Sequence, residues 1–330
     1  MIKLELGRSG LKVAPFAFGG NVFGWTANEK TSFELLDAFV DAGFNLIDTA
    51  DVYSKWAEGH SGGESETIIG NWLERRGRRD DVIIASKFGM EMGPDMKGLS
   101  RKYMFEAVER SLTRLKTDYI DLYQAHSDDE NTPFEETLAA FGELIEAGKV
   151  RAIGASNYKA GRLAAALEAS AKLGLPRYET LQPWYNLYDR GMFEGPLAEL
   201  CRKEQLGVIP FFGLASGFLT GKYRTEKDLE GSARAYRVKY MMDERGMRIL
   251  GALDAVAAEH DATPAQIALA WLRARGVVAP IASATSLEQL AELAAFVDIE
   301  LSNEQVARLN EASEGFLDRP TGPSGPPRRD

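Results

Sequence analysis

The chain has 330 residues, of which 45% are hydrophobic and 27% are charged, and its formal net charge is −10. This composition is typical of a globular protein, and the acidic balance disfavours nucleic-acid or anionic-membrane partners, which bind basic surfaces. No apolar run approaches the roughly 20 residues that a membrane span needs. The single cysteine, Cys201, excludes an intramolecular disulfide and fits a reducing compartment. We therefore expect a cytoplasmic protein without membrane or nucleic-acid partners.

Short apolar segments alternate with helical segments along the chain, and no linker divides them. After a hairpin over 3–6 and 11–13, the pattern predicts strands over 15–18, 44–47, 82–85, 119–123, 150–154, 179–182, 207–211 and 277–281. It predicts helices over 30–42, 64–76, 101–115, 133–147, 195–205, 244–260, 263–275, 287–296 and 303–313. A further predicted helix follows the strand at 150–154 and ends at residue 173. Residues 213–243 carry few helix or strand signals, and 316–330 form a tail rich in proline and glycine.

Eight strand–helix units predict an α/β fold of the (β/α)8 TIM-barrel type, with an N-terminal β-hairpin and extra C-terminal helices. We expect one such domain over 1–330, the last residues being the tail. The alternative is a doubly wound open sheet, which usually binds dinucleotides through G-x-G-x-x-G after its first strand. Residues 19–24, Gly-Gly-Asn-Val-Phe-Gly, lack that spacing. The barrel is therefore the better interpretation.

Four polar residues lie just past the ends of three successive predicted strands: Asp48, Tyr53, Lys87 and His126. Because the carboxyl ends of parallel strands open on one face, we expect these side chains to meet there. A tyrosine has a pKa near 10, and a neighbouring ammonium would lower that pKa into a useful range. Asp48 could hold Lys87, and His126 could bond a substrate oxygen. Such a set suits proton delivery to an oxygen that becomes negative, as when hydride attacks a carbonyl.

Each residue also has a structural interpretation. Asp48 and Lys87 could form an interior salt bridge, Tyr53 could be a packing residue, and a lone histidine after a strand is often structural. Only the placement of all four at successive strand ends favours a catalytic site. We assign no metal ligands.

At these positions the chain resembles the aldo-keto reductase superfamily. The stretch 43–53, Gly-Phe-Asn-Leu-Ile-Asp-Thr-Ala-Asp-Val-Tyr, is similar to the first family signature. The similarity continues at 62–66, 84–87, 118–123, 142–151 and 154–158, and it extends to about residue 315. All four catalytic positions of the family pattern are filled.

By this resemblance, Tyr53 would be the general acid of a carbonyl reductase, Lys87 and Asp48 would assist it, and His126 would orient the carbonyl. The resemblance also implies a nicotinamide cofactor, extended across the barrel mouth. The residues that we expect to bind it are Gly20, Asn21, Asp48, Ser156, Asn157, Gln182, Phe211, Gly213, Leu214, Gly217, Lys222, Ser283, Thr285, Ser286 and Gln289. Phe211 stands where the family often has a tyrosine stacked on the nicotinamide ring.

The sequence departs from the family at the adenosine end of the cofactor. The turn 282–286, Ala-Ser-Ala-Thr-Ser, lacks the Lys or Arg that commonly holds the 2′-phosphate of NADPH. Lys222, Arg224, Arg234 or Arg237 could substitute, so we expect NADPH, with NADH possible. The substrate would be a small aldehyde or ketone that contacts Tyr53, His126, Trp25 and Trp56.

Two other functions fit the same fold. The family contains potassium-channel β subunits, so the chain could be a cofactor-binding regulatory or channel-associated subunit. Lys87 could instead form a Schiff base, as in a barrel aldolase, but Asp48 and Tyr53 would then have no evident role.

Overall fold

A computed structural model describes residues 2–232 and 234–317. Eight parallel strands form one curved sheet in the order β10-β3-β4-β5-β6-β7-β8-β9. They are β3 (Ala17–Gly19), β4 (Leu46–Asp48), β5 (Ile83–Phe88), β6 (Ile120–Ala125), β7 (Val150–Ser156), β8 (Thr180–Gln182), β9 (Gly207–Val208) and β10 (Ile281–Ala282). The sheet closes where the Val278 N–H donates to the Val208 carbonyl and the Ile281 N–H to the Pro210 carbonyl, both at 3.0 Å. The predicted (β/α)8 barrel is confirmed.

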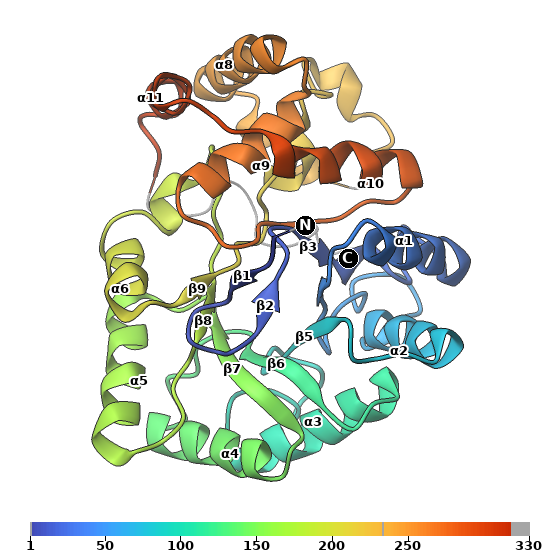
Figure 1. Ribbon diagram of the computed structural model, residues 1–330, viewed down its shortest axis with the longest axis vertical. Coiled ribbons are helices and arrows are strands. Elements are labelled where there is room, and N and C mark those ends of the chain that lie inside the picture. Colours follow the sequence, from blue (N-terminus) through green and yellow to red (C-terminus); the bar gives the residue numbers. More distant parts are fainter. Residues whose placement is uncertain (1, 233, 318–330) are drawn as a thin grey trace.

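Helices α1–α6 lie around the strands, and α8–α11 gather at one end of the molecule (Figure 1). Their bounds are α1 (Glu29–Asp41), α2 (Glu64–Arg76), α3 (Arg101–Leu115), α4 (Phe134–Glu146), α5 (Ala160–Leu173), α6 (Pro196–Glu204), α8 (Glu244–His260), α9 (Pro264–Ala274), α10 (Leu287–Ala294) and α11 (Asn303–Ala312). Most lie within one or two residues of the prediction. Gly77 and Gly174 end α2 and α5 with φ of 65° and 67°, a left-handed conformation that favours glycine.

The strands β9 and β10 are shorter than the predicted 207–211 and 277–281. Proline has no N–H to give to a ladder, so Pro210 and Pro280 interrupt the regular pairing. The backbone still bonds to its neighbours, because the Ala17 N–H donates to the Pro280 carbonyl at 3.1 Å. For the same reason β3 begins at Ala17 rather than at Pro15. Residues 207–211 and 277–281 therefore form part of the barrel wall, although regular strand pairing is confined to one end of each segment.

The long segment 213–243 is built from short helices. They are η3 (Ala215–Thr220), η4 (Glu226–Leu229), α7 (Ala235–Val238) and η5 (Lys239–Met241). The expectation of few helix signals was therefore too simple, since one-turn helices leave almost no periodic pattern. The predicted tail at 316–330 lies almost wholly outside the described residues.

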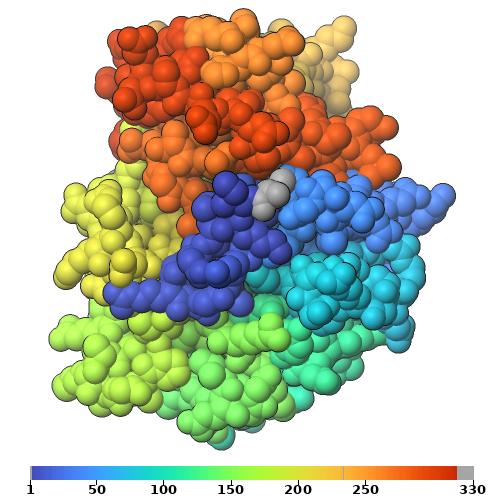
Figure 2. Space-filling model, in the orientation of Figure 1, coloured from blue at the N-terminus to red at the C-terminus, as the bar shows by residue number. Residues whose placement is uncertain are grey.

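The predicted N-terminal hairpin is present, and it closes the amino-terminal end of the barrel. Strands β1 (Leu4–Glu5) and β2 (Lys12–Val13) pair antiparallel. Leu6, Leu11 and Val13 are buried against the residues of the barrel interior. Figure 2 shows this N-terminal segment across the middle of the face. The opposite end of the barrel is therefore the end that can open to a ligand.

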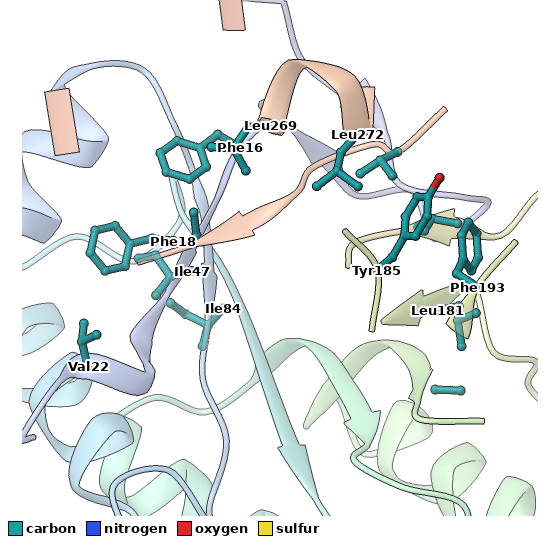
Figure 3. Close-up of a cluster of buried hydrophobic side chains, with 14 of the residues drawn as sticks. Phe16, Phe18, Val22, Ile47, Ile84, Leu181, Tyr185, Phe193, Leu269 and Leu272 are labelled. Atoms are coloured by element: carbon teal, nitrogen blue, oxygen red, sulfur yellow. The ribbon is translucent and has the colours of Figure 1, made fainter. Parts of the chain in front are cut away.

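Side chains alternate between the two sides of the barrel wall, with a period of two residues. Phe18, Ile47 and Ile84 are partners in register on β3, β4 and β5, and they belong to the outer core beneath the helices (Figure 3). The intervening residues Leu46 and Ala85 face the interior with others from neighbouring strands. Each strand therefore has an inward row that continues toward its carboxyl end.

Candidate active site

The inward rows become polar at the carboxyl ends of five neighbouring strands. Past the apolar layer, the inward positions nearest the carboxyl ends are Asp48, Lys87, Gln124, Ser156 and Gln182, and each is at most 1% exposed. Lys87 is in register with Gln124, and Ser156 with Gln182. Strand alternation thus turns all five side chains into one buried polar layer at the mouth.

The predicted catalytic residues come together, although two of them lie inside strands rather than past their ends. Asp48 is the last residue of β4, and Lys87 is the fifth residue of β5. Tyr53 lies in the turn after β4, and His126 directly follows β6. The predicted strand 82–85 stops before Lys87, because a lysine rarely occupies a buried strand position unless it is paired. The structure extends β5 to Phe88, and Lys87 is paired inside it.

Lys87 is the centre of the hydrogen-bonded group. Its Nζ lies 2.8 Å from the Tyr53 hydroxyl, 2.8 Å from Asp48 Oδ2 and 2.8 Å from the Thr49 carbonyl. The Tyr53 hydroxyl also lies 3.1 Å from Asp48 Oδ2. Gln182 Nε2 donates to the other oxygen, Asp48 Oδ1, at 2.8 Å. All three protons of the ammonium have partners, so its position is fixed.

Burial and charge set the protonation of this group. Burial lowers the pKa of Lys87, and the negative charge of Asp48 opposes that shift. Burial and then Asp48 raise the pKa of Tyr53 well above its ordinary value. In this arrangement burial and Asp48 outweigh the lowering of the Tyr53 pKa that we expected from Lys87. Tyr53 therefore keeps its proton until a ligand oxygen can take it.

His126 lies beside Tyr53, with their ring centroids 6.0 Å apart. Its backbone N–H donates to the Phe88 carbonyl at 2.9 Å, which continues the ladder past β6. Burial and then the charge of Lys87 lower the pKa of His126 well below its ordinary value, so the ring is neutral at physiological pH. Its Nδ1 is buried without a hydrogen-bond partner among the described residues. A neutral ring of this kind can donate one hydrogen bond to a ligand oxygen.

The next two strands bring together the amide and hydroxyl groups that sequence reasoning assigned to a nicotinamide. Ser156 Oγ donates to the Gln182 carbonyl at 2.9 Å, and Asn157 Nδ2 donates to the His126 carbonyl at 2.9 Å. Asn157 takes a left-handed φ of 57° just after β7. The half-buried Phe211 ring stands 5.7 Å from the Trp184 ring.

Trp25 and Trp56 meet at the mouth, although they follow different strands. Their ring centroids are 5.6 Å apart, and Trp56 lies 6.0 Å from the Tyr53 ring. Trp56 is 39% exposed. The two indoles form an aromatic wall next to Tyr53.

The loops after β3 and β10 are joined to each other. Ser283 Oγ lies 2.7 Å from the Gly19 carbonyl and 2.7 Å from Asn21 Oδ1, beside Gly20. Gln289 Oε1 accepts from the Thr285 N–H at 2.9 Å, and Ser286 Oγ caps α10 by accepting from the Gln289 N–H at 3.3 Å. Several hydrogen-bonding groups of this turn are therefore already paired with one another.

The loop after β9 carries the remaining predicted residues. Phe212 has a left-handed φ of 57°, and Gly213 and Leu214 follow it into η3. Gly217 has a φ of 93° inside that helix. A Cβ on Gly217 would lie 3.6 Å from Lys222 Cε, so the exposed Lys222 side chain folds back over η3.

Sequence reasoning missed Gln124 and Thr49. Gln182 Nε2 lies 3.4 Å from Gln124 Oε1, so Gln124 belongs to the polar layer. The alternation Leu122, Gln124, His126 could have revealed it, because all three share one face of the strand. The contribution of Thr49 is its backbone carbonyl, which has no sequence signal.

The geometry agrees with the comparison to known proteins. A model of the Aldo/keto reductase family matches residues 15–314. The chain belongs to the aldo/keto reductase family. Members of this family are generally oxidoreductases that use nicotinamide cofactors on small carbonyl compounds.

Several relatives are similar over nearly their full length. Aldo-keto reductase YhdN of Bacillus subtilis is 34% identical over 336 residues, which cover 99% of this chain and 96% of the relative. The uncharacterized oxidoreductase YrpG of the same organism is 35% identical over 318 residues, 94% of this chain and 95% of the relative. A probable voltage-gated potassium channel subunit beta of Oryza sativa is 34% identical over 306 residues, 89% of this chain and 90% of the relative.

Within the described part of the chain, no helix has the length and apolarity that crossing a membrane requires.

Proposed function

We propose that this protein reduces an aldehyde or ketone with a reduced nicotinamide cofactor, and that Tyr53 donates the proton. The observation that carries the proposal is the position of Lys87 Nζ, 2.8 Å from both the Tyr53 hydroxyl and Asp48 Oδ2. A buried ammonium in contact with a phenol stabilises the phenolate that proton donation leaves behind. We also propose that 1–330 form one domain and that the protein acts in the cytoplasm.

Each residue has a separate task in this proposal. His126 donates a hydrogen bond to the carbonyl oxygen and holds it beside the Tyr53 hydroxyl. As negative charge develops on that oxygen, Tyr53 transfers its proton to it, and Lys87 balances the phenolate. Asp48 keeps Lys87 charged and in place, and Gln182 fixes Asp48 from the other side. Trp25 and Trp56 form the wall that excludes water from the substrate.

The residues at the mouth fit a nicotinamide cofactor. His126 Nδ1 and Gln124 Nε2 are buried polar atoms with no hydrogen-bond partner in the described part of the chain, and a ligand at the mouth could satisfy them. Ser156, Asn157 and Gln182 would hold the carboxamide, and Phe211 would stack on the ring. When bound, the cofactor supplies the hydride.

We propose NADPH as the cofactor, with NADH as the alternative. Phosphates in TIM barrels often bind at the loops after the seventh and eighth strands. Lys222 and the turn from Ser283 to Gln289 would bind the anionic part, with Gly20, Asn21, Gly213, Leu214 and Gly217 lining the path between.

Initial rates test the proposed function directly. Purified protein is mixed with NADPH or NADH and a panel of aldehydes, ketones and keto-sugars, and the loss of reduced nicotinamide is followed. We expect carbonyl-dependent oxidation, with an alcohol as the product. Tight cofactor binding without any carbonyl-dependent oxidation would contradict reduction as the function.

A second candidate function is a cofactor-binding subunit associated with a channel. The similarity to the rice potassium channel subunit beta favours it. The inactive outcome of the rate experiment, with cofactor still bound, would support this candidate. The complete Asp48, Tyr53, Lys87 and His126 group is the reason that we place it second.

A further inference from the structure

A second buried ionic group lies beneath the catalytic residues, between the strand ends and helices α2 and α3. We call Asp51, Glu66 and Arg114 the acid cluster. Asp51 is 2% exposed and Glu66 is fully buried. The proposed mechanism uses none of the three side chains.

The acid cluster contains two carboxyl groups but one cation. Arg114 Nε donates to Glu66 Oε2 at 2.7 Å, and Ser86 Oγ donates to Glu66 Oε1. Asp51 Oδ1, in contrast, has no hydrogen-bond partner among the described residues. An ionised carboxylate in such a place is unfavourable, so Asp51 is the group that retains a proton.

The groups around Asp51 act in opposite directions, and burial outweighs the cations. Glu66 faces it from α2, Tyr103 and Arg114 from α3, Lys87 from β5 and Tyr123 from β6. Burial and then the negative charge of Glu66 raise the pKa of Asp51 to about 8, although Arg114, a hydrogen bond from the Val52 N–H and Lys87 oppose the shift.

Asp51 is also connected to the catalytic group. Its backbone N–H donates to the Lys87 carbonyl at 3.0 Å, and it lies two residues before Tyr53 in the same turn. A charge on Asp51 would therefore act on Lys87 and Tyr53 through a medium that screens poorly.

We propose that Asp51 is a positioning residue that must stay protonated for carbonyl reduction, and that its ionisation switches the site off in alkaline solution. This inference rests on the proposed function. An ionised Asp51 adds negative charge near the phenolate that Tyr53 must become, so proton donation becomes less favourable. Ionisation also disfavours the present position of the turn that carries Tyr53, because Asp51 Oδ1 is a buried carboxylate oxygen without a hydrogen-bond partner among the described residues.

The kinetic test compares kcat from pH 6 to 10, at saturating cofactor and carbonyl, for the wild type, Asp51→Asn and Asp51→Glu. We expect kcat of the wild type to fall by about tenfold per pH unit above pH 8. In Asp51→Asn the alkaline fall in kcat should begin at least about one pH unit higher than in the wild type. In Asp51→Glu, which retains a carboxyl group, the alkaline fall in kcat should still be present. The control is Asp121→Asn, which removes a buried carboxylate at the other end of the barrel and should leave the wild-type profile.

A stability test needs no substrate. Because the raised pKa makes the folded state bind the proton more tightly than the unfolded state, wild-type stability should decline between about pH 4 and 8. Asp51→Asn lacks this loss, so its melting temperature relative to the wild type should rise by about 5 °C between pH 5 and 8, then stay constant.

The two tests separate the possible failures. A kcat profile of Asp51→Asn that coincides with the wild type would overturn the inference, as would a melting-temperature difference independent of pH. If the wild type reduces no carbonyl at all, the proposed function fails. The stability test then still decides whether Asp51 ionises as inferred.

Discussion

Both ends of the barrel carry a buried aspartate with basic partners, but the two groups can do different chemistry. At the amino-terminal end Asp121 accepts from Arg79 Nη2 at 2.6 Å, from Arg151 Nη1 at 3.0 Å and from the Ile84 N–H at 2.9 Å. At the mouth Asp48 is bonded to Lys87, Tyr53 and Gln182. Both aspartates are 1% exposed.

The difference lies in the cations and in the third partner. At the amino-terminal end both cations are guanidinium groups and the third partner is a backbone N–H, and their bonds to Asp121 serve to join β5, β6 and β7. A lysine is sensitive to burial, and here it contacts a phenol that can give up a proton. A buried ion pair thus indicates function only when one of its members can exchange a proton with a ligand.

We expect the largest difference in kcat when the cation at each end of the barrel is replaced in turn. Lys87→Met should lower kcat by about 10²- to 10⁴-fold, because Tyr53 loses the charge that stabilises its phenolate. Arg79→Met should leave kcat within about twofold, since Arg79 contacts no reacting group. Steady-state kinetics on both variants checks this prediction. Equal losses of kcat would show that the ammonium has no special role.

Replacing Asp121 should lower the stability of the protein but not its activity. Asp121→Asn leaves two guanidinium groups without their carboxylate, so we expect a loss of about 3 kcal/mol in the free energy of unfolding. The kcat/KM of the folded variant should be unchanged. Urea denaturation measures the first quantity and initial rates the second. A stable but inactive variant would reverse the roles that we give to the two ends.

A smaller effect is expected for the aromatic ring at the mouth. Phe211→Ala should weaken cofactor binding by about tenfold, because a stacked aromatic ring contributes roughly 1 kcal/mol beyond its area. Phe211→Tyr keeps the π-face and should bind as the wild type does. Fluorescence titration with NADPH distinguishes the two. Unchanged affinity in Phe211→Ala would place the nicotinamide elsewhere.

The smallest effect is expected at the exposed Lys222. Lys222→Met should weaken NADPH binding by only about two- to fivefold, since an exposed charge contributes little. The difference should shrink as salt is raised from low to 0.5 M, because exposed charges are screened. Titrations at both salt concentrations check this. A large loss that persists in high salt would mean a buried phosphate contact.

The residues at the mouth were predictable because strand alternation leaves few choices. Asp48, Lys87 and His126 stand on three successive strands, so a parallel barrel must bring them to one end. Their protonation was not predictable from the sequence. The raised pKa of Tyr53 depends on its burial and then on a 3.1 Å contact with Asp48, and no spacing rule gives either one.

Helices were predicted better than strands. Helix α2 has the predicted bounds, because its residues repeat along a turn and Gly77 marks its end. Strand β10 contains only Ile281 of the five residues predicted over 277–281, since its pairing depends on prolines in two neighbouring segments. Asp51 was read only as part of a family motif, because its burial comes from the packing of α2 and α3.

A single-turnover measurement tests the central claim most directly. Enzyme with bound NADPH is mixed rapidly with excess aldehyde, and the loss of nicotinamide absorbance is followed for the wild type, Tyr53→Phe and the control Tyr119→Phe. Tyr119 is a half-buried tyrosine near Arg79 and Arg151 at the other end of the barrel. We predict one fast phase in the wild type and the control, and a rate at least about 10²-fold lower in Tyr53→Phe with the same NADPH affinity. An undiminished rate in Tyr53→Phe would contradict the assignment of Tyr53 as the proton donor.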